Sequence, residues 1–185
     1  MSKARARKIK LLLLDVDGVM TDGTFFLIPG KDGQVEAKAF NAHDGTGFSL
    51  ARLGGLKTGL ITKRVSETVR LRGKDLKIDY VYQGVGDKLA VLQEILKKEK
   101  LKPAEAAFVG DDIIDLPVMR NCGLAFAVAN AREDVKDEAH VITDHRGGDG
   151  AVRDAVEYIL KAQGSLTRCV EAYISGQTPA KDKRQ

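Results

Sequence analysis

The chain has 185 residues, of which 43% are hydrophobic and 30% are charged, a composition typical of one globular domain and not of a disordered or low-complexity chain. The formal net charge is +4, and the positive excess lies at the two ends, in residues 1–10 and 181–184. We interpret these ends as solvated tails and expect no nucleic-acid partner, because nucleic-acid-binding proteins usually carry positive charge along a groove or helix face.

Neither a membrane span nor a secretory signal is expected from the sequence. No apolar run approaches the roughly 20 residues that cross a bilayer, so no membrane partner is expected. The basic residues 1–10 precede an apolar stretch that ends at Asp15, which is too short for a secretory signal. Cys122 and Cys169 are too few for a disulfide framework. The sequence therefore predicts a cytoplasmic protein with reduced thiols.

Strand-like and helix-like segments alternate along the chain. Continuous apolar strands that alternate with helices indicate a parallel sheet covered on both faces. We predict an α/β fold with a doubly wound parallel sheet, whose ligands bind at the carboxyl ends of the strands. The predicted strands are 9–14, 58–61, 80–82, 106–109, 124–128 and 141–143, and the predicted helices are 48–53, 67–76, 88–98, 116–119 and 152–160.

An insertion follows the first strand. Two extended runs flank the turn-forming residues 29–33, and this pattern predicts a β-hairpin over residues 24–40 that projects from the sheet. We divide the chain into a basic N-terminal extension (1–8), a single domain (9–163) and a C-terminal tail (164–185). Helical periodicity fades after the domain, and residues 176–185 are predicted to be flexible.

Carboxylates gather after two of the strands. Asp15 and Asp17 follow the first strand, and Asp111, Asp112 and Asp115 follow the fourth. If these strands are neighbours, four or five carboxylates converge, and such crowding requires a cation. Oxygen ligands without histidine or cysteine indicate Mg²⁺. A pair of turn-forming aspartates is the simpler alternative for the first group alone.

Groups suited to phosphate lie at the same edge. Thr62, Lys63 and Arg64 end the second strand, and Lys88 opens a helix, where backbone N–H groups and a lysine attract an anion. A lone lysine at such a position is usually a solvated helix residue. Together with the carboxylates and the hydroxyl, however, it favours a phosphate site.

These pieces, in this order, resemble the haloacid dehalogenase-type phosphatase superfamily. The matching positions are Asp15 and Asp17 in D-x-D-G, then Thr62, Lys88, and Asp111, Asp112 and Asp115 in G-D-D-x-x-D. The resemblance implies that Asp15 is the nucleophile and Asp17 the general acid and base. It also implies that Thr62 and Lys88 bind the phosphoryl group, and that Mg²⁺ is held by Asp15, the Asp17 carbonyl and Asp111. Asp112 and Asp115 would orient the metal site and Lys88.

Further motifs are similar to one capless branch, the 3-deoxy-D-manno-octulosonate 8-phosphate phosphatases of lipopolysaccharide synthesis. They include Thr21-Asp22-Gly23, Tyr82-Gln83-Gly84 and Gly147-Gly148-x-Gly150, and the similarity covers residues 9–163. The branch implies a homotetramer assembled by the hairpins, in which a neighbour's C-terminal segment closes the active site.

The branch also implies where a sugar-acid phosphate binds. Arg64 is a natural partner for the sugar carboxylate, and the other implied substrate contacts are Asn41, His43, Asp44, Gly45 and Arg72. Three residues depart from the branch pattern, namely Lys63, His43 and Asp149. A nonulosonate 9-phosphate phosphatase and a non-catalytic tetramerisation module remain as alternatives.

Overall fold

A six-stranded parallel sheet forms the centre of the computed structural model, which describes residues 1–31 and 33–176. The strand order is β5-β4-β1-β6-β7-β8, and every neighbouring pair is parallel. This arrangement confirms the predicted α/β class. The strands are β1 (Leu11–Leu14), β4 (Lys57–Ile61), β5 (Tyr80–Tyr82), β6 (Ala106–Gly110), β7 (Leu124–Ala127) and β8 (Val141–Ile142).

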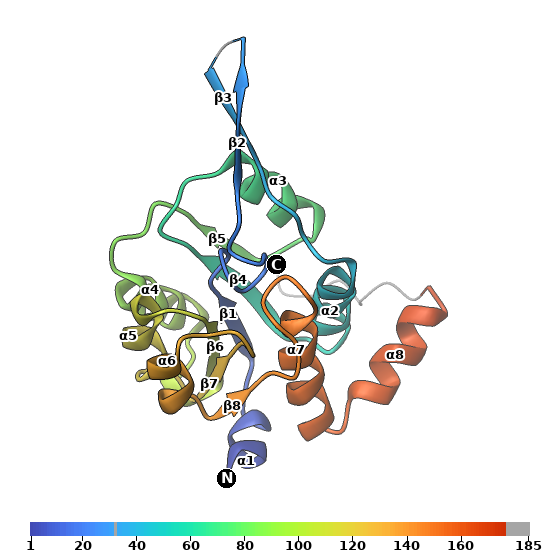
Figure 1. Ribbon diagram of the computed structural model, residues 1–185. Coiled ribbons are helices and arrows are strands. Elements are labelled where there is room, and N and C mark those ends of the chain that lie inside the picture. Colours follow the sequence, from blue (N-terminus) through green and yellow to red (C-terminus); the bar gives the residue numbers. More distant parts are fainter. Residues whose placement is uncertain (32, 177–185) are drawn as a thin grey trace.

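Helices cover both faces of this sheet (Figure 1). One side carries α2 (Ala42–Leu53), α7 (Ala151–Ala162) and α8 (Leu166–Ile174), and the other carries α4 (Lys88–Glu99), α5 (Leu116–Met119) and α6 (Glu133–Glu138). All residues of β1, β6 and β7 are buried, which is why these strands are continuous apolar runs. Two 3₁₀ turns, Pro103–Glu105 and Ile113–Asp115, flank β6. Within the described residues, no helix is long and apolar enough to span a membrane.

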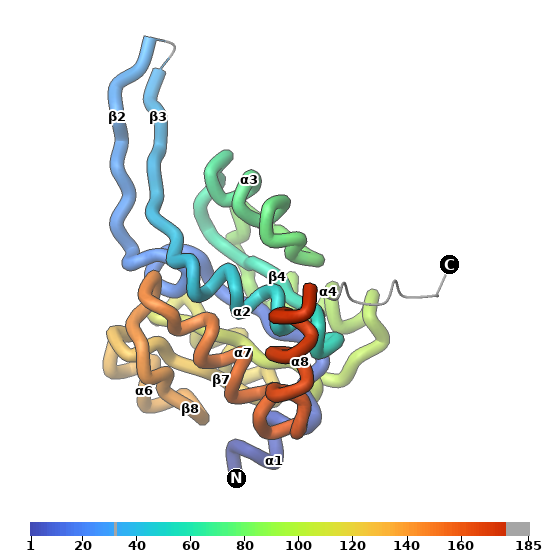
Figure 2. Tube along the Cα trace, turned by 90° about the vertical axis from the view of Figure 1, so that its right-hand side faces the viewer, coloured from blue at the N-terminus to red at the C-terminus, as the bar shows by residue number. Residues whose placement is uncertain are grey.

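The predicted hairpin stands away from the body (Figures 1 and 2). Strands β2 (Phe26–Gly30) and β3 (Gly33–Ala37) pair antiparallel, and α3 (Glu67–Asp75) lies beside the base of β3 in Figure 2. Phe26 and Val35 each keep about 60% of their surface exposed. In a single chain the hairpin therefore presents a bare apolar surface.

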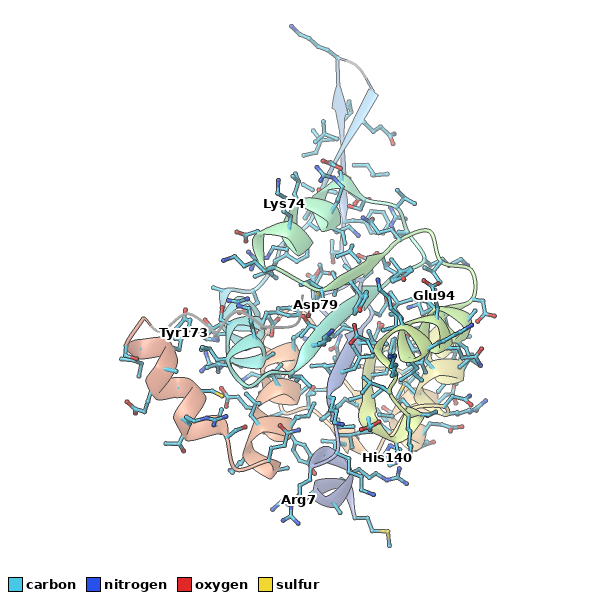
Figure 3. The ribbon with its side chains drawn as sticks, turned by 180° about the vertical axis from the view of Figure 1, so that it is seen from behind. Arg7, Lys74, Asp79, Glu94, His140 and Tyr173 are labelled. Carbon is cyan, nitrogen blue, oxygen red and sulfur yellow. The ribbon has the colours of Figure 1, made fainter. Side chains whose placement is uncertain are left out.

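Residues 2–6 of the basic N-terminus form a helix that packs on the body, so the prediction of a solvated tail is wrong for these residues. A short helix, α1 (Ser2–Ala6), packs at the end of the body opposite the hairpin. The Arg5 guanidinium donates to the carbonyl of Gly123 at 2.9 Å. The Ser2 hydroxyl donates to the carbonyl of His140 at 3.0 Å, and Figure 3 labels His140 at this end of the molecule. These distant partners hold the helix in place.

The first part of the predicted C-terminal tail is also helical. Helix α8 packs against α2 and α7 and buries Cys169, while Tyr173, labelled near the end of this helix in Figure 3, is 47% exposed. The sequence predicted no helix after Gln163, and this prediction is wrong for residues 166–174. Of the predicted flexible tail, residues 177–185 lie outside the described part.

Candidate active site

The sheet topology brings the candidate residues to one edge. Strand β1 pairs with β4 on one side and with β6 on the other, so the residues that follow these three strands are neighbours. They are Asp15 after β1, Thr62 after β4 and Asp111 after β6. Thr62 is buried, and its backbone N–H donates to the carbonyl of Tyr82 on β5 at 3.0 Å.

Asp15 is held from several directions. Its backbone N–H donates to Val109 at 3.1 Å, and its Oδ1 accepts from the N–H of Val16 at 2.7 Å. Its Oδ2 lies 2.9 Å from Nζ of Lys88. Burial, together with the charge of Asp115, raises the pKa of Asp15 to about 6. The carboxylate is therefore fixed in direction and little solvated.

Lys88 bridges two carboxylates. Its Nζ lies 2.7 Å from Oδ1 of Asp115 as well as close to Asp15, and only 4% of its side chain is exposed. Burial alone lowers the pKa of Lys88, but the two carboxylates outweigh it and raise the pKa above the ordinary value. Lys88 is therefore a permanent cation beside the candidate nucleophile.

An oxygen cluster suited to a metal lies at the same place. Carboxylate oxygens of Asp15, Asp111 and Asp115 lie within 4.8 Å of one another. Burial and the neighbouring carboxylates raise the pKa of Asp111 to about 7. Its Oδ1 is buried and has no hydrogen-bond partner among the described residues. An orphaned carboxylate oxygen in such a cluster fits a hard divalent cation such as Mg²⁺.

Asp115 has its oxygens engaged elsewhere. Oδ1 accepts from Lys88, and Oδ2 accepts from the backbone N–H of Asp111 at 3.0 Å. This carboxylate thus orients Lys88 and the loop of Asp111. Asp112 accepts from the N–H of Ile113 at 2.7 Å and caps the following 3₁₀ turn.

The side chain of Asp17 points toward the hairpin base. It pairs with Lys38, and its Oδ2 lies 3.7 Å from Nε of Arg64. The same Arg64 donates to Glu36 at 2.8 Å and stacks 4.0 Å from the ring centroid of Phe25. The structure therefore joins the predicted Asp17 and Arg64 through hairpin residues that the sequence analysis missed. The signal available was Glu36-x-Lys38, two charges on one face of a strand.

The start of α2 serves packing as well as the site. Asn41 caps α2, because its Oδ1 accepts from the N–H of His43 at 2.7 Å, while the His43 side chain is exposed. The carboxylate of Asp44 turns toward the first turn of α7 and accepts from the N–H of Arg153 at 3.1 Å. Burial raises the pKa of Asp44 to about 6. Asn41 and Asp44 thus use their side chains as helix caps.

Arg72 lies against the same turn. A Cβ on Gly45 would be 3.1 Å from its Nη2, so glycine leaves room for the guanidinium. Nη1 of Arg72 lies 2.6 Å from Asp75, and its buried Nε has no hydrogen-bond partner in the described part of the chain. Arg72 is thus close to the predicted substrate contacts of α2.

The Gly-Gly-x-Gly segment packs closely against the loop after β1. A Cβ on Gly147 would lie 1.6 Å from the carbonyl oxygen of Gly18, so only glycine permits this approach. The N–H of Gly148 donates to Val19 at 3.0 Å. Asp149, which departs from the branch pattern, is exposed.

Comparison with known proteins places the chain in one family. A model of the haloacid dehalogenase-like hydrolase family matches residues 61–155. The chain is 42% identical over 163 residues to the 3-deoxy-D-manno-octulosonate 8-phosphate phosphatase KdsC of Escherichia coli K12, a match that covers 88% of this chain and 85% of that protein.

Solved structures agree with the sequence match. The 3-deoxy-D-manno-octulosonate 8-phosphate phosphatase of Yersinia pestis superposes with a TM-score of 0.86 at 40% identity, over 90% of this chain and 88% of that one. The phosphatase of Moraxella catarrhalis, solved with magnesium, phosphate and KDO, gives 0.87 at 36% identity, over 92% and 97%. The chain therefore belongs to the haloacid dehalogenase-like hydrolase family. Within that family, it groups with the 3-deoxy-D-manno-octulosonate 8-phosphate phosphatases.

Proposed function

We propose that the protein is a Mg²⁺-dependent phosphatase that hydrolyses 3-deoxy-D-manno-octulosonate 8-phosphate, a step of lipopolysaccharide precursor synthesis. The observation that carries the proposal is the buried Asp15 carboxylate, held beside Lys88 and the oxygen cluster at the end of β1. The match to phosphatases of that substrate, over most of both chains, supports the choice of substrate. Asp15, Asp17, Lys88 and Asp111 are all present, which argues against a non-catalytic module.

The side chains gathered at the strand ends support the following reaction. The Asp15 carboxylate attacks phosphorus, an aspartyl-phosphate forms, and the ester P–O bond breaks. Asp17 gives its proton to the leaving alkoxide and then takes one from the water that hydrolyses the intermediate. Lys88 and Thr62 bind the phosphoryl oxygens, whose charge they stabilise. A bound Mg²⁺, held by Asp15, Asp111 and the Asp17 carbonyl, would neutralise the repulsion between carboxylate and phosphate.

Arg64 supplies the preference for a sugar acid. Its side chain is 42% exposed, so a substrate carboxylate can reach a guanidinium that Glu36 and Phe25 hold in place. We propose Arg72, whose buried Nε has no hydrogen-bond partner among the described residues, and the turn of His43, Asp44 and Gly45 as further substrate contacts.

The assembly proposed is a homotetramer held by the hairpins. The exposed apolar residues Phe26, Leu27 and Ile28 on an isolated hairpin invite pairing with another copy. We further propose a cytoplasmic enzyme, in keeping with the free, buried thiols of Cys122 and Cys169, with residues 9–163 as the phosphatase domain.

A substrate panel tests the function. Phosphate release is measured with Mg²⁺ on octulosonate 8-phosphate, on a nonulosonate 9-phosphate and on a simple sugar phosphate. We expect the highest kcat/KM for octulosonate 8-phosphate. A higher value for the nonulosonate ester would assign the enzyme to that substrate instead, and no release from any ester would contradict a catalytic role.

A further inference from the structure

Lys38, at the base of the hairpin, has a side chain without exposed surface, which is unusual for lysine. Its Nζ pairs with Oδ1 of Asp17 and lies 3.7 Å from Oε1 of Glu36. It also lies 5.6 Å from the ring centroid of Phe25. A buried ammonium requires such partners, so its position is fixed by the carboxylates on either side.

Glu36 ties this lysine to the body of the protein. Its carboxylate accepts from Arg64 at 2.8 Å and from the Ser66 hydroxyl at 2.5 Å. Its carbonyl accepts from the Thr68 hydroxyl at 3.1 Å. Glu36 therefore joins the hairpin to the loop after β4 and to the first turn of α3. Lys38 lies between Glu36 and Asp17, so the same contacts fix the position of Asp17.

We propose that Lys38 is a positioning residue, which holds the Asp17 carboxyl at the oxygen of the leaving group and is itself fixed by Glu36. The inference rests on the proposed phosphatase function and deepens it. Since the Lys38 side chain is fully covered, a substrate does not reach its ammonium, and the residue acts through Asp17. The hairpin thus contributes Lys38 and Glu36 at its base to the positioning of Asp17, and its strands carry the apolar surface.

Positioning of this kind has a consequence that depends on the leaving group. A sugar alkoxide needs a proton as it departs, whereas p-nitrophenolate leaves without one. The parameter kcat/KM covers the steps up to departure of the alcohol, so it reports protonation by Asp17 for the sugar ester only. Misplacing Asp17 should therefore slow the sugar ester and spare p-nitrophenyl phosphate.

The experiment compares Lys38→Met, Lys38→Arg and wild type on octulosonate 8-phosphate and p-nitrophenyl phosphate. We expect Lys38→Met to lower kcat/KM for the sugar ester by about 10²-fold, the effect of a displaced general acid. The loss on p-nitrophenyl phosphate should stay below about 5-fold, since no proton is needed there. Lys38→Arg should restore most of the sugar-ester activity, because the guanidinium can pair with both carboxylates.

Two controls keep the test specific. Lys57→Met removes a lysine of another ion pair, with Glu99 at 2.6 Å, and should leave both substrates unchanged. Circular dichroism at the assay temperature selects folded variants. Glu36→Gln keeps the size of the side chain but removes its charge and one of the two accepting oxygens, so it provides a milder change with the same substrate dependence.

Equal losses on both substrates would overturn the inference, because they indicate a general electrostatic or folding role. The inference would also be overturned if Lys38→Met left the ratio of kcat/KM between the two substrates unchanged, or if Lys38→Arg did not recover activity on the sugar ester. A wild-type protein without phosphatase activity would contradict the proposed function and this inference with it. If the wild type is active and Lys38→Met has the same kcat/KM values as the wild type, the inference alone is contradicted.

Discussion

Gly18 controls the room available to Asp111. It has φ +89°, and a Cβ built on it would lie 2.0 Å from Oδ2 of Asp111 and 2.5 Å from its Cγ. Ordinary contacts begin at 3.4 Å, so Gly18→Ala forces the carboxylate to retreat by more than about 1 Å. Nearby Gly23 has almost the same backbone, with φ +86°, but its Cβ would meet nothing closer than 3.7 Å.

This pair separates backbone strain from displacement of the metal ligand. Each alanine in a left-handed conformation lowers the free energy of unfolding by about 1–2 kcal/mol, which lowers Tm by roughly 2–8 °C in a chain of this size. Only Gly18→Ala also moves Asp111. A displacement of about 1 Å at a catalytic group costs about 10²-fold in rate, and a lost carboxylate ligand weakens the metal site.

The assay is phosphate release as a function of Mg²⁺ concentration, with Tm measured on the same samples. Gly18→Ala should need at least about ten times more Mg²⁺ for half-maximal activity and lose about 10²-fold in kcat/KM. Gly23→Ala should show the loss of Tm with a nearly normal Mg²⁺ dependence. The same Mg²⁺ dependence in both variants would refute the placement of the metal between Asp15 and Asp111.

Three further predictions concern specificity, assembly and pH. Arg64→Ala should lower kcat/KM for octulosonate 8-phosphate by about 10- to 150-fold, the loss of a charge-assisted hydrogen bond, and barely change p-nitrophenyl phosphate; equal losses would show that Arg64 serves the phosphoryl group or the fold. Replacing Phe26 and Ile28 by serine should shift sedimentation from tetramer toward smaller species, whereas a wild-type monomer at micromolar concentration would contradict the proposed assembly. His140 accepts from the N–H of Ala125 through Nδ1 at 3.0 Å, and burial together with Arg5 lowers its pKa below 6.5. Since the unfolded chain then binds more protons below pH 6.5, this contribution to stability is lost as pH falls, and His140→Asn should reduce that loss in urea unfolding at pH 7.5 and 5.5; an unchanged difference would assign the effect to other groups.

The strand ends could be predicted because their pattern is local. Apolar runs followed by Asp15, Thr62 and Asp111 give both the strand and the edge at which its polar residue lies. The boundary of α2 was less accessible. The helix begins at Ala42, six residues before the predicted 48. Gly45 and Gly47 lower the local helix propensity, so the sequence pattern predicted a later start. The structure explains Gly47, whose Cβ would lie 3.0 Å from Cα of Arg153 on α7.

Contacts between distant segments could not be deduced in this way. Helix α1 has five residues, too few to form alone, and depends on Gly123 and His140, more than 100 positions away. The inward turn of Asp44 toward α7 and the burial of Lys38 beside Asp17 likewise arise from tertiary packing. These are features that no spacing within one segment encodes.

The nucleophilic role of Asp15 is the centre of the account, and one substitution tests it directly. Asp15→Asn keeps the size of the side chain and can still accept from Val16, but it removes the attacking carboxylate. With octulosonate 8-phosphate and saturating Mg²⁺, we predict that phosphate release by the folded variant falls by at least about 10⁴-fold, as for other removed nucleophiles. Substantial phosphate release by folded Asp15→Asn protein would contradict the mechanism.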